Sequence, residues 1–353
     1  MSHAAEQAYL DTRVAVAATR LFPPELVTRL PQMTLKALAG QFGLDAILDD
    51  QPSPTARSRA VEQSLLQLLL SELQVLLRPM SPTQRALILA WGSKYALYNL
   101  KTLIRGKLYA LDPQEIRASL FELPEGMRLP YQELERAENV LELLRQLETG
   151  PYHQIARQAR EVYEQRREPF ALEAAIDQRY YAGILRHVMG LGTVHQDWLR
   201  RLMGAELDRA ALLWLLRFRF SYALSPSETY YQLVPSIRLL TRDQLLRLVN
   251  LETYEQVLQA LPAPLHARLQ GCQSIAEIQQ RLGRHTIRET RRVLAHSQSA
   301  VARALAYLML RENDLLTLFA AVQGRLLGLP DRAIEVAIDL AEPDCAWSGP
   351  AAA

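Results

Sequence analysis

The stretch that decides the fold is Tyr95–Leu108, which reads YALYNLKTLIRGKL. Its leucine and isoleucine side chains recur at steps of three and four residues, the spacing that places apolar residues on one face of an α-helix. Arg105 and Lys107 follow near its end, where positive charge interacts favourably with the helix dipole. The stretch therefore predicts the last turns of a long amphipathic helix.

The same pattern of apolar residues and cations returns twice further along the chain. A shift of 112 residues places Arg217 and Arg219 on Arg105 and Lys107, and a shift of 218 places Arg325 on Lys107. Leucine matches alone mean little in a leucine-rich chain, whereas cations kept in register indicate a repeat. We interpret the chain as three copies of one helical unit, with a period near 110 residues.

An acidic residue also recurs upstream of the second and third cations. Asp208 and Asp314 lie 106 residues apart, and each has a glutamate two positions before it, Glu206 and Glu312. Acidic side chains are favourable in the first turn of a helix, where they cap free N–H groups. We therefore expect both acid pairs at helix starts.

The spacing of the prolines supports an all-α fold. Three windows, 83–112, 170–225 and 265–329, contain no proline, and each holds one copy of the repeat. Proline costs about 3 kcal/mol inside a helix, so such windows predict long helices. Residues 286–327 are long enough for one continuous helix, and Ser53-Pro54 has the pattern of a helix N-cap.

Together, the three copies of the repeat and the proline-free windows predict three units, 1–125, 126–226 and 227–353. A short helix and a tail are expected at the end of the third. Alternation of β-branched residues at every second position is nearly absent, so no sheet is expected.

The composition narrows the class of protein. The chain has 353 residues and is 49% apolar, while 40 basic and 38 acidic residues leave a formal charge of +2. This balance argues against a general nucleic-acid binder, which shows a concentrated basic surface. The two cysteines suggest neither a disulfide framework nor a zinc motif, and a cytoplasmic location is expected. No signal peptide and no membrane span are predicted.

Signatures of catalysis are not found in the sequence. Gly106-Lys107 resembles the end of a phosphate-binding loop, but Lys101 occupies the place of its leading glycine and no Ser or Thr follows. The histidines lack a metal-ligand spacing. We predict no catalytic residue, no cofactor site and no metal site.

The recurrent cations have two possible roles. As ordinary C-terminal helix charges they would lie on a solvated face. As a shared feature of three units around an axis, they would form a ring that binds a partner. The candidate partner-binding residues are Arg105, Lys107, Arg217, Arg219 and Arg325.

Taken in order, these motifs resemble the C subunit of A/V-type ATPases, whose eukaryotic relative is the d subunit of the vacuolar proton pump. Two further stretches fit that family, Tyr9-x-x-x-Arg13 near the start and Asp177-x-x-Tyr180-Tyr181 in the second unit. The resemblance covers roughly residues 5–330. Gln323, Ala211 and Thr317 depart from the pattern, so equivalent contacts by all three copies are not assured.

The resemblance implies a funnel of three pseudo-threefold helical units. It implies a non-catalytic socket between the proteolipid ring in the membrane and the D and F subunits of the central stalk, on the cytoplasmic face. The isolated protein is expected to be monomeric. A free-standing helical-repeat scaffold is the alternative, although such repeats usually have periods of 20–50 residues. The choice between proton and sodium, and between synthesis and pumping, is left open.

Overall fold

The computed structural model describes residues 3–234 and 236–340, and within these residues every regular element is a helix. The all-α prediction is confirmed for this part of the chain. Backbone contacts divide it into two compact units. Among the described residues, unit 1 comprises 3–85 and 287–340, and unit 2 comprises 86–234 and 236–286. Two helices run across the division, α6 (Pro82–Gly92) and α18 (Ile275–His296).

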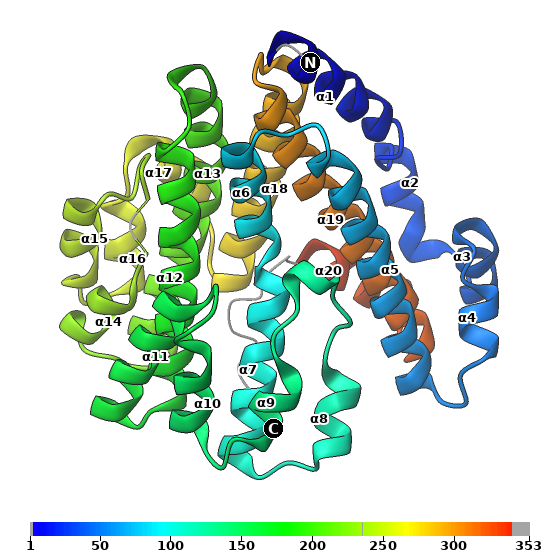
Figure 1. Cartoon of the computed structure of the whole chain (residues 1–353). Coiled ribbons are helices and arrows are strands. Elements are labelled where there is room, and N and C mark those ends of the chain that lie inside the picture. Colours follow the sequence, from blue (N-terminus) through cyan, green and yellow to red (C-terminus); the bar gives the residue numbers. More distant parts are fainter. Residues whose placement is uncertain (1–2, 235, 341–353) are drawn as a thin grey trace. The chain divides into compact units, whose positions relative to one another are not determined.

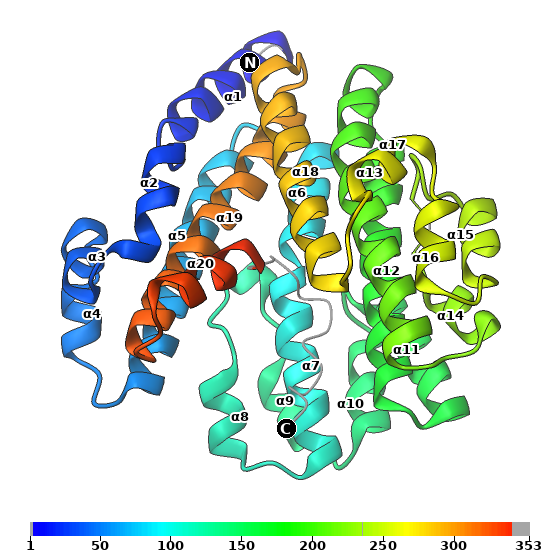
Figure 2. The same cartoon turned by 180° about the vertical axis from the view of Figure 1, so that it is seen from behind.

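Unit 1 therefore joins the beginning of the chain to its end. Its remaining helices are α1 (His3–Ala18), α2 (Pro24–Arg29), η1 (Leu30–Gln32), α3 (Leu35–Phe42), α4 (Asp45–Asp49), α5 (Pro54–Leu77), α19 (Ala300–Leu326) and α20 (Asp331–Leu340). The long helices α5 and α19 lie side by side, and α1 packs against both (Figures 1 and 2). Leu10 and Val14 give α1 a fully buried face.

Unit 2 is built around two long helices, α12 and α13. Its helices are α7 (Lys94–Tyr109), α8 (Pro113–Ser119), η2 (Glu125–Met127), α9 (Tyr131–Arg136), α10 (Val140–Leu147), α11 (His153–Arg166), α12 (Pro169–Met189), α13 (Thr193–Leu216), η3 (Arg217–Ser221), α14 (Pro226–Gln232), α15 (Arg242–Val249), α16 (Tyr254–Gln259) and α17 (Ala263–Leu269). α13 is buried almost all round between Leu207 and Leu216, so it forms the core of this unit. η3 continues it as one π-helical turn.

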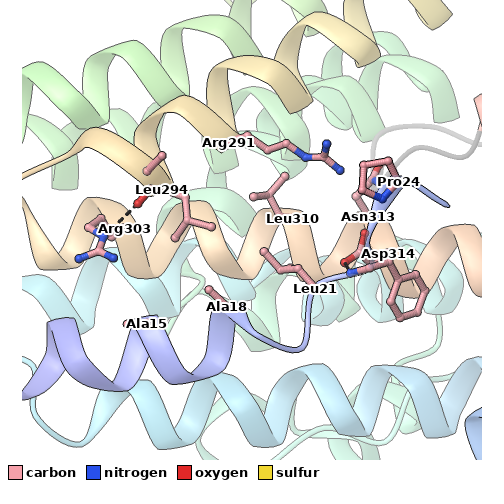
Figure 3. A pocket seen from close by; sticks show the side chains of 12 residues that line it. Ala15, Ala18, Leu21, Pro24, Arg291, Leu294, Arg303, Leu310, Asn313 and Asp314 are labelled. Carbon is pink, nitrogen blue, oxygen red and sulfur yellow. Dashed lines mark hydrogen bonds between the residues drawn. The ribbon is translucent and has the colours of Figure 1, made fainter. Parts of the chain in front are cut away.

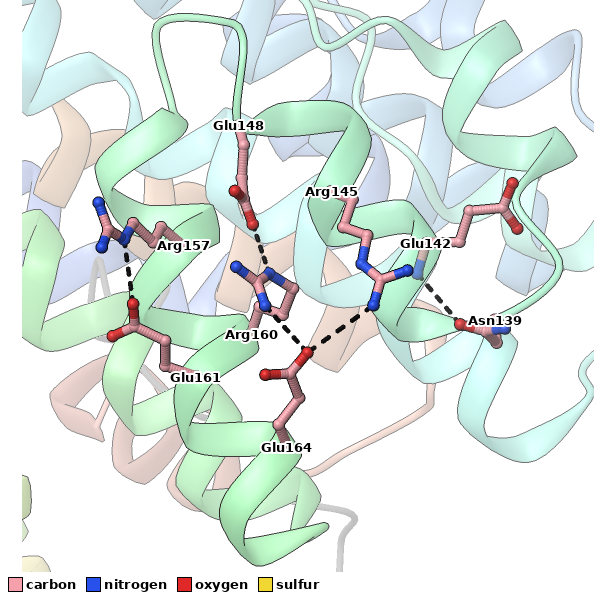
Figure 4. Close-up of polar contacts among 8 residues, drawn as sticks. All are labelled: Asn139, Glu142, Arg145, Glu148, Arg157, Arg160, Glu161 and Glu164. Atoms are coloured by element: carbon pink, nitrogen blue, oxygen red, sulfur yellow. Dashed lines mark hydrogen bonds and ion pairs between the residues drawn. The ribbon is translucent and has the colours of Figure 1, made fainter.

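The helices α10 and α11 are joined on their outer side by a network of ion pairs (Figure 4). Arg160 donates to Glu164 at 2.9 Å and also to Glu148, and Arg145 lies 3.9 Å from Glu164. Networks of this kind contribute more than isolated surface pairs because each charge has several partners.

Several helix ends follow directly from the sequence. The Ser53 side chain accepts a hydrogen bond from the Ala56 N–H, and α5 begins with Pro54 as expected. The single helix predicted for residues 286–327 is wrong. The chain forms α18 and α19 instead, because the Ser299 hydroxyl accepts from the Ala302 N–H and starts a new helix.

The division into 1–125, 126–226 and 227–353 remains a prediction, as does the funnel. The final residues of the predicted tail lie outside the described part of the chain.

Candidate functional site: the long helices and their polar clamps

Two ion pairs join α7 to α12 inside unit 2. Lys101 is paired with Asp177, and both side chains are almost fully buried. One turn further along α7, Arg105 binds Glu173 through two hydrogen bonds of 2.7 and 2.6 Å. These bonds raise the pKa of the Arg105 guanidinium above its ordinary value. Two cations four residues apart on α7 are thus paired with two carboxylates four residues apart on the neighbouring α12.

The tyrosines that follow Asp177 extend this connection. The Tyr180 hydroxyl donates to the Trp91 carbonyl oxygen at 3.0 Å, and the buried Tyr181 ring packs against Trp214 of α13. The Asp-x-x-Tyr-Tyr motif therefore connects α12 to α7, to Trp91 of α6 and to α13 within unit 2.

The cations in register share one structural role. Lys107 donates to the carbonyl oxygen of Glu135 at 2.6 Å, at the end of α9. Arg219 donates to that of Val249 at 2.9 Å, at the end of α15. Arg325 donates to that of Met33 at 2.8 Å, just after η1. Each cation therefore caps free carbonyl groups at the C-terminus of a short helix, where positive charge is favourable.

The acids in register hold the other end of the same short segments. The Asp208 carboxylate accepts hydrogen bonds from the N–H groups of Leu239 and Leu240, shortly before α15 begins. The Asp314 carboxylate accepts from the Phe22 N–H at 2.8 Å, shortly before α2 begins. The expectation that these acids cap their own helices is wrong. They lie far inside α13 and α19, and burial raises the pKa of both, that of Asp314 to about 6.

In two of the three copies, an acid and a cation eleven residues apart therefore bind the two ends of one short segment. We call such a pair a polar clamp. Asp208 and Arg219 hold α15, and Asp314 and Arg325 hold the α2–η1 segment. On α7 the residue in register with the acids is Ala96, and the corresponding segment is held by Asn99, eight residues before Lys107. The Asn99 side chain accepts from the N–H of Phe121 and donates to its carbonyl oxygen, both at 2.8 Å.

Close packing at the helix ends supports the repeat between the first and third copies. A Cβ atom placed on Gly106 would overlap the Ile116 side chain, and one on Gly324 would lie 2.6 Å from Ile334. Both pairs have the same separation along the chain, and the two pairs lie 218 residues apart. The second copy has Phe218 at the corresponding place, so this contact is not shared by all three.

The predicted partner-binding residues are half-buried and bonded within the chain. Beyond the contacts above, Arg217 donates to Gln279 of α18 at 2.8 Å, and Arg325 also binds Asp331 at 2.6 Å. They do not form a solvated face, so that interpretation is wrong. Arg325 belongs to unit 1 and the other four to unit 2. The common ring and the contact with a partner remain predictions.

Sequence reasoning missed the buried Glu72 of α5. Its carboxylate accepts a hydrogen bond from the Tyr307 hydroxyl and lies 3.4 Å from Arg311, so it joins α5 to α19. The signal was present, because Glu72 is the one charged residue in the apolar run from Leu65 to Leu77. A lone acid on an apolar helix face predicts a buried partner.

A pocket of about 450 Å³ lies beside Asp314 in unit 1 (Figure 3). Apolar residues of α1, α18 and α19 form most of its wall, among them Ala18, Leu294 and Leu310. Arg291 extends over the hollow near Asn313 (Figure 3). The described residues include no group of three His, Cys, Asp or Glu side chains placed to hold a metal ion. In the same part of the chain, no helix has both the length and the apolar character that crossing a bilayer requires.

Comparison with known proteins identifies the family. A family model described as ATP synthase (C/AC39) subunit matches residues 10–336. The chain belongs to this family. The resemblance seen in the sequence is therefore confirmed for nearly the whole chain.

The relatives of this ATP synthase (C/AC39) subunit include archaeal proteins named as the C subunit of an A-type ATP synthase. The one from Methanosarcina mazei is 22% identical and is aligned over 93% of this chain and 91% of its own length. The one from Methanocaldococcus jannaschii is 22% identical over 92% of this chain and 84% of its own. The one from Methanosarcina barkeri is 22% identical over 93% and 91%.

Proposed function

We propose that this chain is a non-catalytic coupling subunit of an A/V-type rotary ATPase. In this role it is a socket that links the proteolipid ring of the membrane to the D and F subunits of the central stalk, on the cytoplasmic face. The family match over residues 10–336 carries the proposal. Ions are moved by the complex, and this chain transmits torque between ring and stalk.

The clamps support a mechanical role. A part that transmits torque must resist bending and twisting, and the long helices are tied to their surroundings by side chains whose hydrogen bonds are directional. Within unit 2 the Lys101–Asp177 and Arg105–Glu173 pairs cross-link α7 and α12. Within unit 1 Glu72 ties α5 to α19. Such buried polar contacts favour one arrangement of helices over others.

Co-purification is the direct test of this proposal. The full chain carrying an affinity tag is expected to recover stalk and proteolipid subunits from detergent-solubilised membranes. ATP-driven ion pumping should be lost when the chain is omitted from reconstituted complexes and restored when it is added back. Recovery of neither ring nor stalk subunits would contradict the socket role and favour a free-standing scaffold.

The cations Arg105, Lys107, Arg217, Arg219 and Arg325 remain our proposed contacts with stalk or ring. Each is half-buried and also forms at least one hydrogen bond within the chain. Replacing Arg105, Arg217 and Arg325 together by Glu separates two roles. Weaker binding with an unchanged melting temperature would indicate direct contact. A large fall in melting temperature would indicate that they serve the fold.

A further inference from the structure

An exposed apolar surface lies between α1 and α5 in unit 1. On α1, Val16 is 58% exposed and Tyr9 is also exposed, and on α5, Leu68 is 40% exposed and Val75 lies one heptad further. Large apolar side chains that are exposed singly are common, but a cluster of them rimmed by polar groups marks an interaction site.

The two apolar edges enclose a hollow of about 260 Å³. Its lining includes Arg13, Val16 and Arg20 on one side and Leu68, Glu72 and Val75 of α5 on the other. Along α1 the exposed residues Tyr9, Arg13 and Val16 follow at steps of four and three, and Arg20 lies in the turn after the helix ends at Ala18. This spacing places the three α1 side chains on one helix face, so the hollow is a groove bordered by that face and by Leu68 and Val75 of α5.

The rim of the groove is positively charged. Arg13 lies over the Tyr9 ring, 5.0 Å from its centroid, and its Nε donates to the Tyr9 hydroxyl at 2.8 Å. This contact fixes the guanidinium while leaving it exposed, and no acidic side chain among the described residues pairs with it. Arg20 stands at the other end, with its side chain 57% exposed.

The carboxylate in the groove does not cancel this charge. Glu72 lies at the bottom, almost fully buried, and is shared by the Tyr307 hydroxyl, Arg311 and Arg20. A ligand that enters the groove therefore meets apolar side chains at the centre and arginines at the edge.

We propose that the groove between α1 and α5 binds an amphipathic α-helix of another protein of the ATPase complex, with apolar residues along its centre and acidic residues at its margins. A helix fits because its apolar side chains recur at the same three- and four-residue steps as the exposed residues of α1. Acidic margins fit because opposite charges across an interface select the partner and speed association. Tyr and Arg, which frame the groove, are the residue types enriched among strong interface contacts. The inference rests on the proposed function, since it places one of that function's partners.

The test uses charge reversal at exposed positions. The variant Arg13→Glu/Val16→Glu places two acids in the groove, and Leu246→Glu/Arg247→Glu makes the same change on the exposed face of α15 as the matched control. Binding of the full-length variants to the purified D–F stalk complex and to the detergent-solubilised ring is measured separately. We expect the groove variant to bind one of the two at least about tenfold more weakly, and the control to bind both like the native chain.

The remaining outcomes distinguish failure of the proposed function from failure of this inference. If the native chain binds neither complex, the proposed function fails and this inference with it. If the native chain binds but the groove variant binds both equally well, the inference is wrong and the function stands. Equal loss in both variants, or loss only of binding to anionic lipid vesicles, would also overturn it.

Folding of the groove variant is checked by circular dichroism and thermal melting, which should match the native chain because both side chains are exposed. If the double variant melts early, Arg13→Gln alone serves the same purpose. It removes the charge and keeps the helix, so its binding should be weaker at low salt and approach the native value at high salt. An unchanged affinity at low salt would contradict the proposal.

Discussion

Lys101 and Asp177 form an ion pair between α7 and α12 in which the Lys101 side chain is 2% exposed and that of Asp177 is 6% exposed. Charges so far from water are costly unless they are paired, because neither can be solvated. This pair therefore fixes how the two helices face each other, and it accounts for an acid and a lysine in otherwise apolar surroundings.

Removing one member of this pair should destabilise unit 2 strongly. Lys101→Met leaves the Asp177 carboxylate buried without its cation, and the expected cost is about 3–5 kcal/mol in the free energy of unfolding. The double variant Lys101→Met/Asp177→Leu should recover most of this loss, because both charges of the pair are then removed. Urea denaturation measures both. Arg157→Met, which breaks the exposed pair with Glu161, is the control and should cost less than about 1 kcal/mol.

The buried Asp314 should make stability depend on pH. Burial raises its pKa from the ordinary 3.8 to about 6, even though Arg311 and Arg291 lower it. The folded chain therefore holds this proton more tightly than the unfolded chain does. The contribution of Asp314 to stability is most favourable below about pH 4 and falls as the pH rises to about 6. The total change is on the order of 3 kcal/mol.

Asp314→Asn provides the measurement. The amide keeps an oxygen that accepts the Phe22 N–H and cannot ionise. The difference in unfolding free energy between variant and native chain should therefore grow in favour of the variant between pH 4 and pH 7. A difference that stays constant across this range would show that Asp314 titrates normally.

Gly324 should not tolerate a side chain. A Cβ atom there would lie 2.6 Å from the Cγ1 of Ile334, which is fully buried and has little room to move. Gly324→Ala should cost about 1–3 kcal/mol by overpacking, despite the better helix propensity of alanine. Gly283→Ala is the matched control, because nothing lies within 4 Å of its added Cβ, and it should be neutral or stabilising.

A double variant separates crowding from other effects at this position. Ile334→Ala removes the Cγ1 and Cδ1 atoms, which would lie 2.6 and 3.1 Å from a new Cβ on Gly324. The costs of the two changes should then add up to more than the cost of the combined variant. Simple additivity, measured by denaturation of all three variants, would rule out the steric explanation.

The network on α10 and α11 should be sensitive to salt. Arg160 bridges Glu148 and Glu164, and these contacts raise the pKa of its guanidinium. Arg160→Gln should lower the melting temperature at low ionic strength, and the difference should shrink at about 1 M salt, where charges are screened within roughly 3 Å. A salt-independent loss would indicate packing by the arginine stem in place of charge.

Much of the candidate site could be recognised from the sequence, although its contacts could not. The register of Lys107, Arg219 and Arg325 was visible as a spacing, and all three do the same thing in the structure, the capping of a short helix. Their targets lie 28 to 30 residues further on for the first two and near the beginning of the chain for the third. A spacing along one helix contains no information about which distant carbonyl group it will meet.

The contacts of Asp208 and Asp314 could not be predicted from the sequence either. Asp208 and Asp314 were expected at helix starts, because a local cap is the commonest reason for an acid near an apolar run. They hold other segments instead, since the helices begin 15 and 14 residues earlier, at Thr193 and Ala300. The break between α18 and α19 was not predicted, because the helical spacing of apolar residues continues on both sides of it. Only the N-cap residue Ser299 marks the start of the second helix.

The sequence by itself determined the helical class, the repeated motif and helix starts such as that of α5, because these depend on residues three or four apart and on proline and serine at helix ends. The family followed from the order of the motifs. Only the tertiary structure decided that the first residues complete the unit that contains α19, and that the recurrent cations are bonded within the chain. Those outcomes depend on contacts between segments up to about 290 residues apart, such as Phe22 with Asp314, which no local pattern encodes.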